Sequence, residues 1–205
     1  MRKPKLTYFD NPFSRGEECR LAFVLSGADF DDNRLPREAW AALKPSTPFG
    51  SLPYLEVDGH APLGQTNAIL GLIGRLHGTH PSDPYEAARH EAMMGHVEDL
   101  RQKVGVTVYM TDAEEKKKAR EDLVANYLRT WAHDAEKHIV GSGPFFAGSK
   151  AHVVDAKLHM AVRWFNGGRV DHIPATIFAD FPRLNRVHDA VRDHKAVQAW
   201  YAKSR

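Results

Sequence analysis

Cysteine is almost absent from the 205-residue chain, which contains only Cys19. A single cysteine excludes an intramolecular disulfide and a cysteine-rich zinc site, and it is typical of reducing compartments. Long hydrophobic runs are missing too, because the longest, Leu21–Leu25, is far shorter than the ~20 residues that a membrane helix needs. The first residues lack the apolar core of a signal peptide. We therefore expect a cytoplasmic protein with no membrane partner.

An excess of charge of one sign is also missing. Lysine and arginine number 28 and aspartate and glutamate number 26, so the formal net charge is +2. Nucleic-acid-binding proteins usually concentrate lysine and arginine on one face, so we expect no nucleic-acid partner. The hydrophobic fraction of 42% and the charged fraction of 26% are those of an ordinary globular protein.

Proline is missing between Tyr85 and Gly143, although seven of the twelve prolines lie within residues 1–62. An interior proline costs a helix ~3 kcal/mol, so long helices are expected in the proline-free region and short mixed elements before it. Residues 78–84 hold two prolines among small polar residues, which is typical of a linker. We predict an α/β domain over residues 1–77, a linker over 78–84 and an all-helical domain over 85–205.

Short elements alternate in the first of these domains. Lys5–Phe9 has the aromatic and β-branched residues of a strand, and Ser14 can cap the helix that follows. The Asp58-Gly59 pair supplies the positive φ values of a two-residue hairpin turn. The predicted elements are a strand over 5–9, a helix from 14, a strand over 30–35, a short helix over 37–43, a hairpin over 52–63 and a helix over 67–76.

Helical periodicity dominates the remainder of the chain. Val97, Leu100 and Val104, for example, recur on one helical face. The predicted helices cover residues 85–110, 112–139, 154–166 and 182–203.

Two neighbouring features in the first domain suit an extended peptide that carries a carboxylate. Pro53 directly precedes a strand-like run, which leaves the N–H and C=O groups of Leu52 free to pair with such a ligand at the start of an edge strand. Gln65 and Thr66 stand at the start of a helix, where side-chain and backbone donors can hold an anion. Taken separately, the two features are a turn and a helix cap.

Motifs for other chemistries are incomplete. His90-Glu91 begins like a zinc-protease motif, but Met94 stands where the second histidine belongs. Asp155 and His159 lie four residues apart on a predicted helix, a spacing more typical of a local hydrogen bond than of a metal site. No glycine-rich phosphate loop follows a strand. We therefore expect no metal and no nucleotide.

Five segments together resemble the glutathione transferase family over essentially the whole chain, and most closely its tyrosine-type sigma and pi classes. The segments are Lys5–Phe9, Pro48–Pro53 leading into Leu55–Gly59, Gln65–Ile69, Val97–Arg101 and Phe181–Leu184. The resemblance implies a thioredoxin-like N-terminal domain, an all-helical C-terminal domain and a homodimer. It also implies a detoxifying enzyme that conjugates the thiolate of glutathione, its co-substrate, to small hydrophobic electrophiles.

The resemblance also implies a catalytic centre. Tyr8 matches the tyrosine that donates a hydrogen bond to the glutathione sulfur, with Arg15 in support. Ser14, at the start of the helix, occupies the place where serine-type transferases keep their activating hydroxyl, so it competes with Tyr8 for this role unless it is only a helix cap. Phe13 and Tyr109 are expected in the electrophile pocket.

The glutathione contacts implied by the resemblance are spread along the chain. Trp40 and Lys44 match contacts to the glycyl carboxylate, and Leu52, before a Pro53 expected to be cis, matches the backbone partner of the cysteinyl part. Gln65 and Thr66 match the residues that hold the γ-glutamyl end, and Asp99 matches an acid that reaches it across a dimer interface. Ser51 is shorter than the usual contact at its position.

Two further positions depart from the pattern. Cys19 lies more than one turn inside its predicted helix, so a packed structural role is expected. His152 replaces the usual serine or threonine three residues before Asp155. Within the same fold, a glutathione-dependent peroxidase or isomerase and a non-catalytic glutathione-binding homologue are the alternatives to a transferase.

Overall fold

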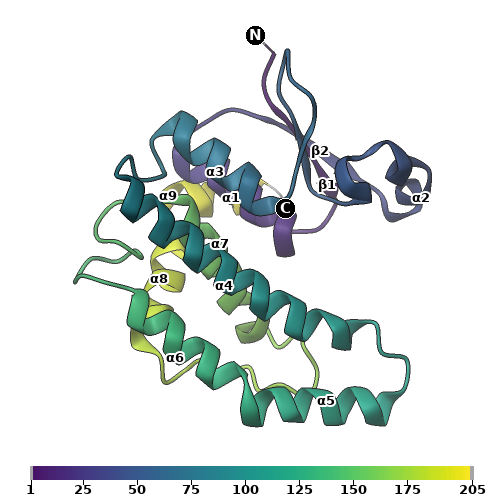
Figure 1. Ribbon diagram of the computed structural model, residues 1–205, viewed down its shortest axis with the longest axis vertical. Helices are drawn as coiled ribbons and strands as arrows, with labels where there is room; N and C mark the ends of the chain where they lie inside the picture. The colour runs from purple at the N-terminus through teal and green to yellow at the C-terminus, as the bar shows by residue number, and fades with distance from the viewer. Residues whose placement is uncertain (1, 204–205) are drawn as a thin grey trace.

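A four-stranded sheet with the strand order β2-β1-β3-β4 lies in the N-terminal part of the computed structural model, which describes residues 2–203. β1 (Lys5–Phe9) pairs in parallel with β2 (Asp31–Leu35) and antiparallel with β3 (Tyr54–Glu56). β4 (Leu63–Gly64) pairs antiparallel with β3. α1 (Ser14–Ser26) and α3 (Thr66–His77) pack against each other, as Figure 1 shows.

Between β2 and β3 the chain runs through short helical turns. These are η1 (Arg37–Ala39), α2 (Trp40–Leu43), η2 (Lys44–Ser46) and η3 (Pro48–Gly50). In Figure 1 this segment projects to one side of the sheet.

Helices make up the regular structure of the described chain beyond residue 83, as predicted. They are α4 (Pro84–Val108), α5 (Ala113–Asn126), α6 (Leu128–His138), α7 (Val153–Asn166), α8 (Pro182–Arg192) and α9 (Lys195–Lys203). α4 crosses the middle of the molecule and α5 and α6 lie at the end away from the sheet (Figure 1). α7 packs against α1, α4 and α8. The predicted fold class, a thioredoxin-like α/β part followed by a helical part, is confirmed.

Three predicted elements were wrong in detail. The helix expected over 112–139 is broken at Tyr127, whose φ of −131° is not helical, and the helix expected over 182–203 is broken between α8 and α9. The hairpin connects Glu56 to Leu63 through six residues instead of two. Asp58 and Gly59 still form a turn inside this loop, since the N–H of His60 donates to the carbonyl of Val57.

One continuous hydrophobic core joins the sheet to the helices. Leu6 and Leu55 from the sheet and Phe23 and Ile69 from α1 and α3 belong to the same buried cluster as Leu158 of α7. Cys19 is fully buried in this cluster, and burial raises the pKa of its thiol, which agrees with the structural role expected for it.

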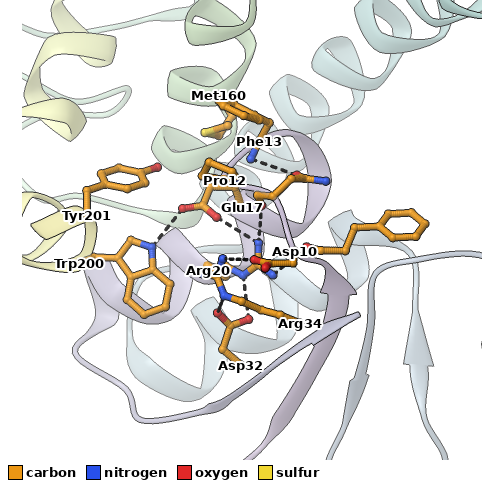
Figure 2. Close-up of polar contacts among 12 residues, drawn as sticks. Asp10, Pro12, Phe13, Glu17, Arg20, Asp32, Arg34, Met160, Trp200 and Tyr201 are labelled. Atoms are coloured by element: carbon orange, nitrogen blue, oxygen red, sulfur yellow. Dashed lines mark hydrogen bonds and ion pairs between the residues drawn. The ribbon is translucent and has the colours of Figure 1, made fainter. Parts of the chain in front are cut away.

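A buried arginine ties α1 to the sheet. Arg20 donates to Asp32 of β2 at 2.8 Å and to Glu17 at 3.2 Å. Figure 2 shows Trp200 approaching the same carboxylate from α9, where its indole N–H donates to Glu17 at 3.1 Å. Glu17 is therefore a buried partner of both Arg20 and Trp200.

Three histidine rings meet where residues 78–84 pass between α4 and the start of α7. His90 of α4 lies 4.9 Å from His152 and 6.1 Å from His80, measured between ring centroids. Both ring nitrogens of His90 are buried without a hydrogen-bond partner. Burial, followed by the repulsion of His152 and His80, lowers the pKa of His90 to about 3.

The free energy of unfolding is expected to fall by about 2 kcal/mol through His90 alone when the pH drops from 7.5 to 5. The unfolded chain binds a proton at His90 near pH 6.5, while the folded protein resists it down to about pH 3. The contribution of His90 to stability is therefore complete above pH 7 and is lost as the pH falls below 6.5. Urea unfolding across this range measures the slope.

The control for this prediction is a histidine in solvent. His90→Leu should remove about 2 kcal/mol from the loss of unfolding free energy between pH 7.5 and 5, whereas His133→Leu, at a side chain that is 62% exposed, should leave this loss unchanged. An equal slope in wild type and His90→Leu would contradict the assignment.

Candidate active site

A cavity of about 470 Å³ opens between the end of β1, the start of α1, and helices α4 and α7. It brings together the five residues that the sequence predicted for the catalytic centre and the electrophile pocket. They are Tyr8, Phe13, Ser14, Arg15 and Tyr109.

Tyr8 lies on β1 at the base of this cavity and is 9% exposed. Its ring packs directly on the backbone of α1, because a Cβ added to Gly16 would lie 2.0 Å from the Cδ1 of Tyr8. Only glycine fits there. Burial raises the pKa of Tyr8 above its usual value of 10, although Ser14, Arg101 and Arg15 each act to lower it. The hydroxyl is therefore protonated at neutral pH and can donate a hydrogen bond.

Ser14 occupies an unusual backbone conformation beside Tyr8. Its φ is +62°, which costs a non-glycine residue about 1–2 kcal/mol. The alternative that Ser14 is the helix cap is wrong, since Phe13 is the N-cap and Ser14 is the first residue of α1. The Ser14 hydroxyl instead forms a hydrogen bond with Tyr8 and accepts one from Arg101 at 3.3 Å.

A chain of alternating charges extends behind these two hydroxyls. Arg101 of α4 pairs with Glu18 of α1, and the second oxygen of Glu18 accepts from Lys157 of α7 at 3.0 Å. Lys157 also donates to Glu98 at 2.5 Å, and Glu98 accepts from Arg15 at 2.7 Å. The side chains of Glu18 and Lys157 are 0% exposed. Lys157 and Arg15 hold the pKa of Glu98 at about 2 despite its burial.

This series of ion pairs fixes the direction of each hydrogen bond near Tyr8. Arg101 donates to Ser14, so the Ser14 hydrogen is free to point at the Tyr8 oxygen. The Tyr8 hydrogen is then free to point into the cavity. Hydrogen bonds arranged in series in this way polarise one another. The arrangement suits a sulfur or oxygen anion placed above Tyr8.

The predicted peptide-binding residues lie outside this cavity, near the end of β3. The peptide bond between Leu52 and Pro53 is cis, as expected from the resemblance. The prediction of an edge strand was wrong, because β3 lies between β1 and β4. Within residues 2–203, the N–H and C=O of Leu52 nevertheless make no hydrogen bond, since Leu52 precedes the strand.

Gln65 and Thr66 form the start of α3, as predicted. Gln65 is exposed, has a φ of +69° and makes no capping hydrogen bond with its side chain. The hydroxyl oxygen of Thr66 is buried and has no partner in the described part of the chain. Such an orphaned group fits a polar ligand at this helix start.

The side chains of the remaining predicted glutathione contacts differ in their exposure and in the groups that they already contact. Lys44 is exposed, and Trp40 packs edge-on against Phe9 with 5.9 Å between ring centroids. The Ser51 hydroxyl bonds back to the carbonyl of Pro48 at 3.4 Å. Asp99 is exposed on α4 beside Lys103 and Tyr127, outside the lining of the Tyr8 cavity.

Sequence reasoning missed several residues of the cavity and the charge chain behind it. They are Glu18, Arg37, Glu98, Arg101, Lys157, Met160, Arg163, Trp164 and Arg169. One signal was available: Lys157 lies among the mostly apolar residues of Val153–Val162, where a charge needs a partner.

Between residues 2 and 203 no group of three or more histidine, cysteine, aspartate or glutamate side chains is arranged to hold a metal ion. No helix in that range is both long enough and apolar enough to cross a membrane.

Comparison with known proteins gives this fold its family. Residues 4–75 match the family model of the glutathione S-transferase N-terminal domain, and residues 98–204 match that of the C-terminal domain. The chain belongs to the glutathione S-transferase family.

Individual relatives agree with this assignment. The chain is 47% identical to glutathione S-transferase 1 of Ascaris suum over 100 residues, which are 49% of this chain and only 48% of that protein, so this match spans about half of each. It is 30% identical to the hematopoietic prostaglandin D synthase of Gallus gallus over 97% of this chain and 95% of that protein. Among solved structures, the Ascaris lumbricoides glutathione S-transferase is 29% identical with a TM-score of 0.78, covering 100% of this chain and 98% of that one.

Proposed function

We propose that the protein conjugates glutathione to small electrophiles. The observation that carries the proposal is the Tyr8 hydroxyl, which stays protonated and faces a cavity beside a chain of donors formed by Arg101 and Ser14. Membership of the glutathione S-transferase family supports the choice of glutathione as co-substrate.

In the proposed complex, glutathione lies across the ends of β1, β3 and α3. The backbone of Leu52 pairs with the cysteinyl part, and Gln65 and Thr66 hold the γ-glutamyl end. Trp40 and Lys44 contact the glycyl carboxylate, while the main chain around Ser51 and Pro53 shapes the turn. The free backbone groups of Leu52 and the orphaned Thr66 hydroxyl support this placement.

The proposed chemistry begins with ionisation of the bound thiol. A free thiol has a pKa near ~8.5, so only a few per cent is thiolate at pH 7. Lowering that pKa by ~2 units takes ~2.7 kcal/mol, which the Tyr8 hydrogen bond and the start of α1 can supply together. The thiolate then forms a C–S bond with the electrophile, whose leaving group departs with the electron pair of the broken bond. Phe13 and Tyr109 border the space for that electrophile.

Two hydroxyls compete for the sulfur, and we assign the contact to Tyr8. Ser14 already bonds to Tyr8 and to Arg101, so we give it the role of orienting the phenol. Arg15 supports the thiolate through its charge, which is partly balanced by Glu98.

The experiment is a conjugation assay with purified protein, glutathione and 1-chloro-2,4-dinitrobenzene. We expect turnover well above the uncatalysed rate. An inactive protein that still binds glutathione would overturn the proposal in favour of a non-catalytic glutathione-binding homologue.

A glutathione-dependent isomerase is the second candidate. Its support is the similarity to proteins named prostaglandin D synthase, including one from Nilaparvata lugens whose structure matches with a TM-score of 0.86 and 26% identity over 98% of both chains. Isomerase or peroxidase turnover without conjugation would favour this reading.

We also propose a cytoplasmic homodimer with a detoxifying role, divided into domains at residues 1–77 and 85–205. The exposed position of Asp99 supports the dimer, because this carboxylate lies outside the Tyr8 cavity and would serve a glutathione held by a second copy. The hookworm protein Na-GST-3, a solved structure 26% identical with a TM-score of 0.77 over 98% of this chain and 97% of that one, is described as monomeric, so the fold alone does not dictate the dimer.

A further inference from the structure

The cavity above Tyr8 is lined by five arginines and by no acidic residue. The five are Arg15, Arg37, Arg101, Arg163 and Arg169. Two of them have acidic partners outside the cavity lining, because Arg15 pairs with Glu98 and Arg101 pairs with Glu18.

The other three arginines have no acidic partner within residues 2–203. Arg163 donates to the Pro12 carbonyl at 3.3 Å and to the Tyr201 hydroxyl at 2.6 Å, both of which are uncharged. Arg169 lies over the Phe13 ring, 3.5 Å from its centroid, and Arg37 lies 5.5 Å from the centroid of Phe9. Stacking on rings holds these guanidinium groups at the cavity and leaves most of their N–H donors unused.

Apolar groups fill the space between the arginines. Met160 and Trp164 from α7 and Phe13 at the start of α1 line the same cavity. In Figure 2, Met160 and Phe13 lie together beside Pro12, on the side from which Tyr201 approaches. A purely apolar electrophile would bury these surfaces but would leave uncompensated positive charge beside it.

We propose that the electrophilic substrate is an organic anion, with an apolar body and a carboxylate or sulfonate that Arg163 and Arg169 hold. This rests on the proposed transferase function and specifies its substrate class. The apolar body packs on Met160 and Trp164 and presents its electrophilic carbon to the sulfur above Tyr8. The anionic group receives charge-assisted hydrogen bonds, which are about twice as strong as neutral ones.

The probe is a matched pair of aryl chlorides, 4-chloro-3,5-dinitrobenzoate and its neutral carboxamide. With either compound the thiolate bonds to the chlorine-bearing carbon and chloride leaves with the C–Cl electron pair, so the carboxylate takes no part in the reaction. Each kcat/KM is divided by the uncatalysed rate constant with glutathione, and the anion-to-neutral ratio is compared between variants. We expect a ratio of roughly ten in the wild type, which increasing salt lowers.

Substitutions test which arginines cause the preference for the anionic substrate. Arg169→Gln and Arg163→Gln should each lower the ratio severalfold, and Arg169→Lys, which keeps the charge, should retain most of it. Arg192→Gln removes an exposed arginine on α8 outside the cavity and should leave the ratio unchanged. Because Arg163 also contacts Tyr201, thermal unfolding of each variant separates loss of fold from loss of preference.

A binding measurement separates this inference from the proposed function. Quenching of tryptophan fluorescence by 3,5-dinitrobenzoate and by 3,5-dinitrobenzamide, which have no leaving group, reports anion preference without turnover. Activity toward both chlorides with a ratio near one would overturn the anion assignment while the transferase function stands. Inactivity toward both, with the benzoate still bound more tightly in an Arg169-dependent way, would overturn the transferase function and support the anion site.

Discussion

Replacing Tyr8 with phenylalanine is expected to lower kcat/KM for conjugation about tenfold or more at pH 6 and to move the midpoint of its pH profile up by about one and a half units, because the start of α1 still supplies the remainder. The thiolate fraction at pH 6 falls from about a quarter to about one per cent when the thiol pKa rises from ~6.5 to ~8. A more basic thiolate is intrinsically more nucleophilic, which recovers part of the loss. The pH dependence of kcat/KM therefore reports the change more clearly than one rate does.

The matched control for this variant is Tyr85→Phe, at a side chain that is 75% exposed at the start of α4. It should leave both the rate and the profile unchanged. Ser14→Ala removes the hydroxyl that orients Tyr8 and should shift the midpoint less than Tyr8→Phe does. A larger shift in Ser14→Ala than in Tyr8→Phe would give the sulfur contact to Ser14.

Glu18→Gln is expected to lower the free energy of unfolding by about 3–5 kcal/mol. The substitution keeps the shape of the side chain but removes the carboxylate that accepts from both Arg101 and Lys157. Lys157 then remains buried with Glu98, which Arg15 already shares, and Arg101 remains buried without an acidic partner among residues 2–203. Urea unfolding, compared at equal slope m, measures the loss.

Two further variants test the origin of this loss. The double variant Glu18→Gln with Lys157→Met removes one buried charge of each sign and should recover at least half of the lost stability. Glu91→Gln, in the exposed pair with Arg75, should cost less than about 1 kcal/mol. If Glu18→Gln costs no more than Glu91→Gln, the buried charge chain does not stabilise the fold.

Local patterns in the sequence predicted the fold well. Alternating short elements, the proline-free region and the periodicity of Val97, Leu100 and Val104 depend on neighbours in the chain, so they can be read from the chain. The breaks at Tyr127 and before α9 were missed because neither contains a proline or glycine. At each break the two helices pack on a shared buried cluster, α5 and α6 on one and α8 and α9 on another, and such long-range packing is not encoded locally.

The candidate site was predictable only where it follows from local motifs or from the family resemblance. Tyr8, Ser14 and Arg15 come from one short segment and do lie together. Glu18 and Lys157 are 139 residues apart, and helical periodicity shows which face of a helix is buried but not which partner faces it. For the same reason the sequence did not predict Arg163 and Arg169 in the cavity. Their stacking on Phe13 depends on how α7 docks against the start of α1.

The most direct test of the account is the ultraviolet absorbance of the thiolate in the complex of the protein with glutathione, titrated against pH. We expect the midpoint for the bound thiol near pH ~6.5, about two units below that of the free thiol. Tyr8→Phe should raise the midpoint to about 8 while glutathione stays bound, since only the start of α1 then lowers the thiol pKa. A wild-type complex whose thiol ionises near ~8.5 would contradict the central claim that Tyr8 and its supporting donors activate glutathione.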